Sequence, residues 1–363
     1  MIASRTRAFT LVEMMVSTAV VIILLSVMVT MTGQTGNMWR YTNSKVEQFR
    51  EARTGFEAVT RRLSQATLNT YWDYRYDKNN QPEKYVRKSE LRFRSGPMEE
   101  LMKTATPPRP THGVFCQAPL GRSDVATAVG VPYRGMDSLL NTWGCFLEFG
   151  DDKDFRPNFL NTSSWPLRYR YRLLEMTVPT EQLSIYNLTA QKPAALAPGW
   201  NGWFAPSVSA TTNRPVRPVA ENIVALVLLP RLSAAEERER AKTGKEMLAK
   251  DYRYDSMSSD ISDAEINQRF QLPPAMQVTM VAIDETSAVR LAARFGTKPP
   301  DLKLGSLFQE AKKLEDDPGT PAAGDGDLDT LQKTLVDLKA NFRVFSATVS
   351  IRSAKWSRAQ KSP

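Results

Sequence analysis

The sequence predicts an α+β protein in which one long N-terminal helix, first membrane-spanning and then amphipathic, packs on an antiparallel β-sheet. Three observations predict this class. An uncharged apolar run occupies 14–31, a helical stripe of apolar side chains follows it, and later segments alternate between apolar and polar residues with the period of two of β-strands. With 363 residues, 42% of them hydrophobic, the chain is long enough for one large or two small domains.

The apolar run is preceded by Arg5 and Arg7 and by a single carboxylate, that of Glu13. About 18 apolar residues suffice to cross a bilayer as a helix, and the basic residues favour a cytoplasmic N-terminus. A carboxylate in the apolar core of a bilayer costs about 2.5–3.5 kcal/mol on insertion scales, so we expect Glu13 to have a partner or a function. An ordinary secretory signal and a plain single-pass anchor are the alternatives.

The predicted helix continues beyond the apolar run. Polar residues return after Gly33 and Gly36, but apolar residues still recur at alternating spacings of three and four, as on one buried helix face. The stripe consists of Phe49, Ala52, Phe56, Val59, Leu63 and Ala66. We therefore expect one helix over 9–68 with a flexible point near the two glycines, its second part lying on a β-sheet. A short coiled coil is the alternative for this stripe.

Six segments of the remaining chain are predicted β-strands. Apolar residues alternate with arginines in 91–94 and in 167–173, which contains Arg168, Arg170 and Arg172. We interpret these arginines as a solvent-exposed sheet face, with a docking surface for an acidic partner as the alternative. The other expected strands are 143–149, 223–229, 275–283 and 342–351. Because 223–229 is apolar throughout, we expect it at the centre of a sheet, covered on both faces.

The connections between these strands are rich in proline, glycine, asparagine or charged residues, and little regular structure is expected in them. The Pro-rich connections are 104–110 and 192–218, and 317–327 is a break rich in Gly, Pro and Asp. Three segments outside these connections are predicted helical: 234–250, a short helix from Ser262 or Asp263 to Phe270, and 328–338, where leucines recur at helical spacing.

Cys116 and Cys145 are the only cysteines, and His112 is the only histidine. Outside the cytoplasm the two cysteines could form a disulfide that stabilises the fold by about 3 kcal/mol, but spacing alone leaves free thiols equally open. Two cysteines and one histidine are too few for the usual Cys/His zinc sites. We expect His112 in a loop or at the start of a strand.

Alternating acids suggest calcium as the one metal to consider. Asp325, Asp327 and Asp329 could supply hard oxygen ligands, although Thr330 and Val336 stand where an EF-hand loop needs Gly and Glu. The alternative is a polar turn whose acids begin a helix. A second acidic turn contains Asp151, Asp152 and Asp154. We therefore predict no cofactor, with Ca²⁺ as the exception to test.

The sequence also bears on catalysis and on nucleic-acid binding. The chain contains no G-x-S-x-G, P-loop or Rossmann glycine motif, and a single histidine leaves none for a second catalytic role, so we predict that it is not an enzyme. The net charge of +9 could favour nucleic acid or an anionic membrane. However, the basic residues are spread along the chain, and we predict no firm nucleic-acid partner.

Residues 8–13, Ala-Phe-Thr-Leu-Val-Glu, together with the apolar run behind them, resemble the N-terminus of type IV prepilins and type II secretion pseudopilins. The resemblance implies that a prepilin peptidase cuts between Ala8 and Phe9 and that Phe9 becomes an N-methylated first residue. It also implies that Glu13 of one subunit pairs with the Phe9 amine of a neighbour and sets the register of assembly. The residue before the cut is usually Gly in this family, and here it is Ala8.

Later segments extend the resemblance. Residues 220–226 and 272–280 look like two strand segments of J-type minor pseudopilins, and 342–349 with Lys355-Trp356 look like the prepilin-type family called Verru_Chthon cassette protein C. This implies four parts: a leader at 1–8, a transmembrane helix at 9–31, its amphipathic continuation at 32–68, and an α+β head at 69–363 with long Pro-rich and charged insertions.

The resemblance also implies a location and partners. The chain would cross the inner membrane once, with its C-terminal head in the periplasm. Its partners would be the prepilin peptidase, other pilin-like subunits contacted through the N-terminal helix, and membrane lipid. The expected function is that of a minor structural subunit of a pseudopilus or type IV pilus-like fibre. A membrane-anchored periplasmic enzyme or binding protein and a DNA-binding minor pilin are the alternatives.

Overall fold

The computed structural model describes most of the chain, and it describes side chains in these ranges except at 33–48. The described residues are 11–102, 106–124, 136–157, 159, 165–186, 198–242, 247–258, 268–314 and 326–356. They divide into two compact units, up to Arg50 and from Glu51 onward. The architecture is α+β with antiparallel sheets and an N-terminal apolar helix, as predicted.

The predicted N-terminal helix is present as two helices, α1 (Leu11–Gln48) and α2 (Arg50–Leu63), separated at Phe49. The backbone between Gly33 and Gly36 is helical, so the helix continues through the expected flexible point, whose flexibility stays a prediction. The amphipathic stripe is confirmed as a buried face. Its buried members are Ala52, Phe56, Val59, Leu63 and Ala66.

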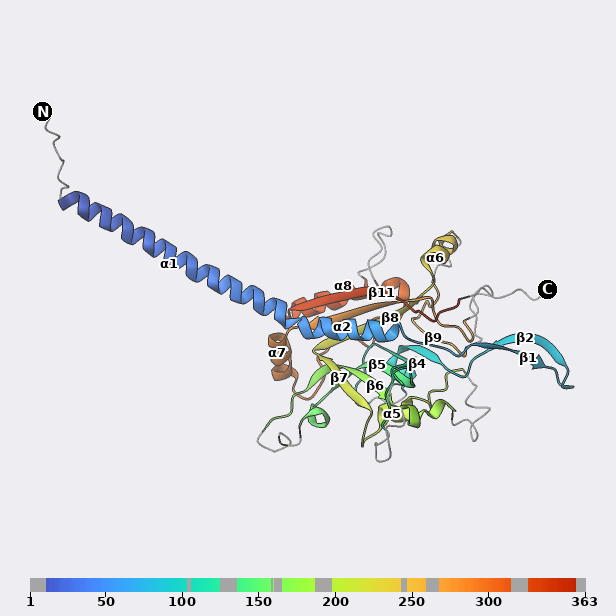
Figure 1. The fold of residues 1–363 in the computed structure, drawn as a ribbon. Helices are drawn as coiled ribbons and strands as arrows, with labels where there is room; N and C mark the ends of the chain where they lie inside the picture. The colour runs from blue at the N-terminus through green and yellow to red at the C-terminus, as the bar shows by residue number, and fades with distance from the viewer. Residues whose placement is uncertain are drawn as a thin grey trace. The chain divides into compact units, whose positions relative to one another are not determined.

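The buried face of α2 packs on strands of two different sheets (Figure 1), so a coiled coil is not needed to cover it. The Phe56 ring lies 5.9 Å from the ring of Phe345 in β11 (Phe342–Ser350). On the other side, Gly55 approaches β7 (Val216–Glu221) so closely that a Cβ at Gly55 would lie 2.9 Å from the Cβ of Ala220. Only glycine allows this approach without a shift of the helix.

The larger sheet has six strands in the order β7-β6-β5-β4-β3-β9, and all neighbouring strands are antiparallel. Its strands, besides β7, are β3 (Phe93–Pro97), β4 (His112–Pro119), β5 (Leu140–Gly150), β6 (Arg170–Val178) and β9 (Tyr254–Asp255). β5 contains the predicted strand 143–149. β3 and β6 overlap the predicted segments 91–94 and 167–173 but begin later than expected.

The second sheet has three antiparallel strands in the order β11-β10-β8, with β8 at Ile223–Arg231 and β10 at Ala275–Ile283. The predicted bounds of β10 and the start of β11 are confirmed. β8 is buried on both faces, as expected, because it also lies against strands β4, β5 and β6 of the larger sheet. Its predicted central position was wrong, since β8 is an edge strand of its own sheet.

Side chains from the larger sheet close the free edge of β8. The backbone N–H of Leu226 donates to Oγ1 of Thr111 (3.2 Å), and that of Leu228 donates to Nδ1 of His112 (3.0 Å). His112 is the first residue of β4, so its predicted place at a strand start is confirmed. A buried edge strand normally leaves amides without acceptors, and these two contacts supply them.

A third, two-stranded sheet pairs β1 (Tyr71–Tyr76) with β2 (Pro82–Lys88). The strand predictions did not include this hairpin, nor the strands β4 and β7. The Pro-rich connection 192–218 contains the short helix α5 (Ala205–Ser209) and the start of β7, so it is more ordered than expected.

Helices and short 3₁₀ turns cover the sheets of the head. The predicted helix at 328–338 is confirmed as α8 (Asp327–Asp337), with Leu331 and Leu335 buried. The remaining α-helices among the described residues are α3 (Met98–Leu101), α6 (Ala234–Ala241) and α7 (Glu285–Phe295). The 3₁₀ turns described are η1 (Lys153–Phe155), η3 (Thr180–Gln182), η4 (Ser184–Tyr186) and η5 (Ala311–Lys313).

Two helix predictions were only partly right. The predicted helix 234–250 ends early, because α6 stops at Ala241 and 247–250 are not helical. The predicted caps Ser262 and Asp263 lie outside the described residues, and 268–270 are not helical. α7 was not predicted, although the N–H of Ser287 donates to the Asp284 side chain (2.7 Å) and caps its start.

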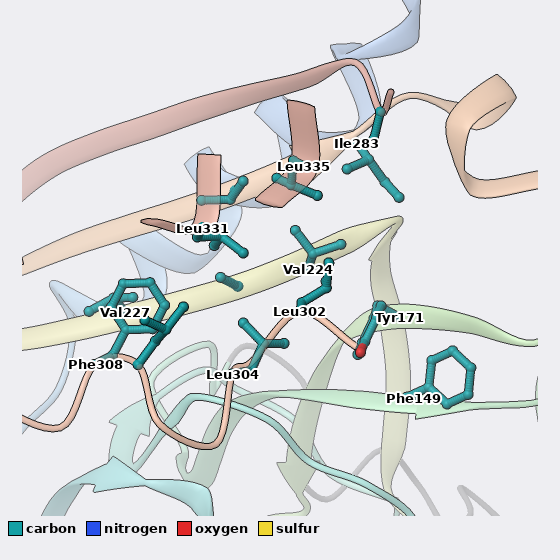
Figure 2. Packing of buried hydrophobic residues seen from close by; sticks show 14 of the residues in the cluster. Phe149, Tyr171, Val224, Val227, Ile283, Leu302, Leu304, Phe308, Leu331 and Leu335 are labelled. Carbon is teal, nitrogen blue, oxygen red and sulfur yellow. The ribbon is translucent and has the colours of Figure 1, made fainter. Parts of the chain in front are cut away.

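Two hydrophobic clusters are described in the head, besides the buried face of α2. One joins β8 and β10 to helices α7 and α8, to the segment 302–314 and to the ends of β5 and β6 (Figure 2). The other lies around β4, β5 and β6 and includes a close stack of Phe115 on Phe204, with ring centroids 3.9 Å apart. The described core is therefore spread over both larger sheets rather than confined to one.

Candidate functional site: the apolar helix α1 and the charged groups of the head

The first 22 described residues, Leu11–Thr32, form a helix that is long and apolar enough to cross a membrane, and none of it is buried within the chain. Four of its hydroxyl groups are bonded inside the helix. Ser17 Oγ donates to the carbonyl of Glu13, while Thr18, Thr30 and Thr32 donate to carbonyls three or four residues earlier, at 2.8 to 3.0 Å. These four hydroxyls therefore do not depend on water, which suits an apolar surrounding.

Glu13 is the only ionisable residue between Leu11 and Thr32. It lies in the first turn of α1 and is exposed. A carboxylate in a first turn is favoured by the partial positive charge of the helix N-terminus. Ala8 and Phe9, the residues of the predicted cleavage, lie outside the described residues, so the cleavage and the pairing with Glu13 stay predictions.

The two cysteines are free and fully buried, so the disulfide that the sequence left open is not formed. They lie on the neighbouring strands β4 and β5, where Cys116 faces Trp143 and Cys145 faces Val114. The cysteines are therefore diagonal neighbours, a relation that separates residues by roughly 7–8 Å, whereas a disulfide usually needs Cα atoms within about 6.8 Å. Burial raises the pKa of both thiols.

The predicted calcium ligands are not brought together in the described structure. Asp325 lies outside the described residues. Asp327 is the first residue of α8, and its carboxylate accepts the backbone N–H of Phe308 (2.8 Å). Burial raises the pKa of the Asp327 carboxyl group. Asp329 lies in the first turn of α8, where an acid favours the helix start. Among the described residues, no cluster of three or more His, Cys, Asp or Glu could hold a metal ion.

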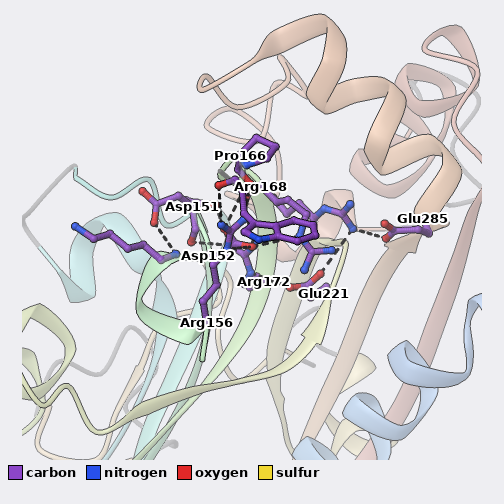
Figure 3. Close-up of polar contacts among 12 residues, drawn as sticks. Asp151, Asp152, Arg156, Pro166, Arg168, Arg172, Glu221 and Glu285 are labelled. Atoms are coloured by element: carbon purple, nitrogen blue, oxygen red, sulfur yellow. Dashed lines mark hydrogen bonds and ion pairs between the residues drawn. The ribbon is translucent and has the colours of Figure 1, made fainter. Parts of the chain in front are cut away.

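The second acidic turn belongs to a charged network (Figure 3). Asp152 is buried and pairs with Arg156 (2.9 Å) and Arg168 (3.2 Å). Burial alone would raise the pKa of Asp152, but hydrogen bonds from the Arg168 backbone and from both guanidinium groups lower it to about 2. The carboxylate is therefore ionised and held by two arginines, which leaves it little freedom to bind a cation.

The arginines of β6 do not form the exposed sheet face that we predicted. Arg170 and Arg172 are 6% and 2% exposed, because β6 is an inner strand that is covered on both faces. Arg172 donates to Glu221 (3.1 Å) and to the carbonyls of Gly150 (2.9 Å) and Asp151 (2.8 Å). An acidic docking partner is therefore not needed for these two side chains.

The network extends to α2 and α7. Arg170 pairs with Glu285 at the start of α7 and lies 3.7 Å from Glu221. The backbone N–H of Glu221 donates to the Glu51 carboxylate in the first turn of α2 (2.8 Å). These ion pairs hold one end of β6 and β7 to the helices on either side, which is a structural role rather than a catalytic one.

His112 is unsuited to catalysis or metal binding in this structure. Its Nδ1 accepts from Leu228, and its Nε2 lies 3.0 Å from the carbonyl of Phe308, so the neutral tautomer with hydrogen on Nε2 satisfies both contacts. Burial lowers the pKa of His112 to about 4. Both ring nitrogens are occupied, and the ring is uncharged at neutral pH.

Sequence reasoning missed one exposed surface, the β1–β2 hairpin. It carries Trp72, Tyr74, Tyr76 and Tyr85, which are 48% to 57% exposed. The signal was present, because aromatic and charged residues alternate over 72–76 and Asn79-Asn80 follows as a turn. It was missed because neither strand has the apolar face that identifies a strand packed on a core.

Comparisons of the chain with models of protein families, with curated proteins and with solved structures find no match. The class of protein is therefore defined by the fold itself. It is an α+β protein with antiparallel sheets and one N-terminal helix that is long and apolar enough to cross a membrane.

Proposed function

We propose that the chain is a pilin-like structural subunit of the pseudopilin type. In this proposal, a prepilin peptidase cuts the precursor between Ala8 and Phe9, the new terminus is N-methylated, and α1 enters a pseudopilus or type IV pilus-like fibre. The chain would serve as a minor subunit, anchored in the inner membrane with its head in the periplasm. The observation that carries the proposal is the uncovered apolar segment Leu11–Thr32 of α1, whose single carboxylate, Glu13, lies in the first turn.

The exposed surface of α1 supports a role in assembly. A helix that is apolar on every side requires lipid or other helices as its surroundings. In a bundle of such helices, van der Waals packing supplies most of the attraction, and one polar group can select the register. An unpaired Glu13 would be costly there, so a register that places it beside a neighbour's terminal amine is favoured over shifted registers.

Cleavage and pairing are linked in this proposal. Removal of residues 1–8 creates the cationic amine at Phe9, four residues before Glu13. Without cleavage, the amine stays on Met1, eight residues further from the apolar run. A peptidase that recognises 8–13 would therefore also create the Phe9 amine with which Glu13 pairs in the fibre.

The mature N-terminus provides the first test. The protein would be purified from membranes of cells with and without a prepilin peptidase, and its N-terminal peptide analysed by mass spectrometry. We expect N-methylated Phe9 with the peptidase and uncut protein without it. An intact Met1 in both cells, or a cut near Gly33, would contradict the proposal.

A substitution of Glu13 separates a fibre subunit from a plain anchor. Glu13→Ala should leave insertion into the membrane unchanged, because it removes a charge from an apolar segment, and should strongly reduce crosslinking of α1 to the N-terminal helices of neighbouring pilin-like subunits. Ser17→Ala, one turn later on the same helix, is the matched control, because the Ser17 hydroxyl is already bonded within the helix. Wild-type crosslinking by Glu13→Ala would favour the plain anchor.

A further inference from the structure

The β1–β2 hairpin is a ribbon without a core of its own. Its two strands are largely exposed along their length, and it extends away from the two larger sheets of the head (Figure 1). A two-stranded ribbon is at best marginally stable in water, because it buries little apolar surface. Its side chains therefore have to stabilise each other.

Aromatic rings supply that stabilisation on one face. The register places Tyr85 opposite Tyr74, and Arg87 opposite Trp72. The rings of Trp72 and Tyr85 are parallel, with centroids 5.9 Å apart, and Tyr74 meets Tyr85 edge-on at 4.9 Å. The Arg87 guanidinium lies 5.4 Å from the centroid of the Trp72 ring. About half of each ring is still exposed, so the row of rings presents an open surface.

The acids of the ribbon are already engaged within it. Asp73 pairs with Lys88 (2.5 Å), and Glu83 pairs with Arg75 (2.9 Å). The Asp77 carboxylate accepts backbone N–H groups of the turn that follows it, at 2.8 Å. The ribbon's anionic groups are therefore satisfied inside the hairpin and do not repel a polyanion strongly.

The cations of the ribbon outnumber its acids. Residues 71–88 contain five Lys or Arg and three Asp or Glu. Neither Lys78 at the turn nor Lys84 on β2 takes part in an ion pair among the described residues. The open ring face is therefore accompanied by an excess of positive charge.

We infer that this ribbon, Tyr71–Lys88, binds single-stranded nucleic acid, with bases stacked on the ring row and phosphates near Lys78, Lys84 and Arg87. Exposed aromatic rings combined with cations are the usual surface for single strands, because every base has a face that can stack and every nucleotide carries a phosphate. A duplex is a poorer ligand, since its bases are already stacked on one another.

The composition of the ribbon favours a nucleic acid over a lipid surface. Binding to a bilayer interface requires buried apolar area. Val86 is the only aliphatic side chain between Tyr71 and Lys88, and the rest of the apolar surface is tyrosine and tryptophan. The ribbon would bind single strands whether or not the chain is cleaved and assembled, so its test and the tests of α1 fail independently.

The test uses the full-length chain in nanodiscs of zwitterionic lipid. Binding of a fluorescently labelled dT20 strand is followed by anisotropy at several salt concentrations, with a 20-base-pair duplex and heparin as competitors. We expect dT20 to bind more tightly than the duplex. Replacing both Trp72 and Tyr85 by Ala should weaken binding about tenfold or more, with little change in the salt dependence. Tyr186→Ala, at a tyrosine of similar exposure (49%), is the matched control.

Two further variants separate stacking from charge and from loss of the ribbon. Trp72→Phe with Tyr85→Phe keeps the rings and should keep most of the affinity. Lys78→Gln with Lys84→Gln should reduce the slope of log K against log salt by about 0.7 per lysine. Lys298→Gln, at an exposed lysine on another part of the head, should leave the slope unchanged.

Three results would overturn the inference. One is equal affinity for dT20, duplex and heparin, which would indicate charge alone. Another is wild-type affinity after the Ala substitutions at Trp72 and Tyr85. The third is failure to bind dT20 in protein that binds vesicles containing phosphatidylglycerol through the same two rings, which would identify a lipid surface instead.

Discussion

The helices α1 and α2 follow each other in the chain but have opposite relations to water. Every described side chain from Leu11 to Thr32 is exposed, although most are apolar, whereas α2 is rich in charged residues and buries one complete face. The difference shows that the arrangement of apolar residues around the helix axis decides burial within the head, not their number. The apolar surface of Leu11–Thr32 is not buried within the chain, so it requires lipid or other helices as its surroundings.

If burial rather than residue type determines how much stability a substitution removes, a buried and an exposed arginine should differ most. Arg172→Met leaves Glu221 and two carbonyls without their donor in a buried place, and should lower the free energy of unfolding by about 3–5 kcal/mol. Arg53→Met, which removes the exposed Arg53–Glu57 pair of α2, should cost about 0.5 kcal/mol or less. Urea unfolding followed by tryptophan fluorescence measures both, and similar losses would break the comparison.

Leucines in the two helices provide the direct test. Leu63→Ala in α2 removes a fully buried side chain and should cost about 2–5 kcal/mol in the unfolding of the head. Leu24→Ala in α1, where the leucine is 61% exposed, should leave that free energy unchanged. An equal loss for Leu24→Ala would contradict the prediction, because this leucine would then contribute to the stability of the head.

Acid should destabilise the head through His112. The folded-state pKa of about 4 lies below the ordinary value of 6.5, so the unfolded chain takes up a proton first as the pH falls. Stability is therefore full above pH 6.5 and should decrease by about 3 kcal/mol between pH 6.5 and 4. His112→Gln, which can still accept from Leu228 and donate to Phe308, should remove most of this dependence.

Asp152 should affect the stability of the head in a separate and lower pH range than His112. Its pKa of about 2 lies below the ordinary 3.8, so its contribution is present above pH 3.8 and is lost as the pH falls through 2. In Asp152→Asn the loss of stability below pH 4 should be smaller than in the wild type. A steeper loss in the variant would show that the two arginines do not depend on this carboxylate.

The cysteines should give the smallest effect. A reducing agent should leave the midpoint of unfolding unchanged, because Cys116 and Cys145 are free. Both thiols should react with a maleimide only when the head unfolds, since both are fully buried. Resistance of the unfolded chain to the reagent before reduction, with reaction after it, would reveal a bridge instead.

Sequence patterns predicted correctly the elements that bury one face and expose the other. The stripe of α2 followed from periodicity alone, because that pattern records which side of the helix meets the core. The arginines of β6 were misjudged because a period of two distinguishes two faces but does not tell whether a second layer covers both. The hairpin escaped notice for the opposite reason, since nothing covers either of its faces.

The candidate sites were predictable to different degrees. Glu13 was identified from its contrast with the apolar residues around it, and this contrast needs no structure. The state of the cysteines depends on the register of β4 and β5, which spacing in the sequence does not contain. The occupied acceptors and donors around His112 and Asp152 come from segments far away in the chain, so only the folded structure could reveal them.

Thr111 and His112 also determine which edge of the three-stranded sheet could pair with an additional strand. Their side chains occupy outward amides of β8, whereas β11 forms the other margin with no further strand beside it in the described structure. A strand added to this sheet would have to hydrogen-bond to backbone groups at one of its edges. Two amides at the edge of β8 are already bonded to side chains, whereas no strand pairs with the outer edge of β11 in the described structure. Any addition of a strand to this sheet would be confined to β11.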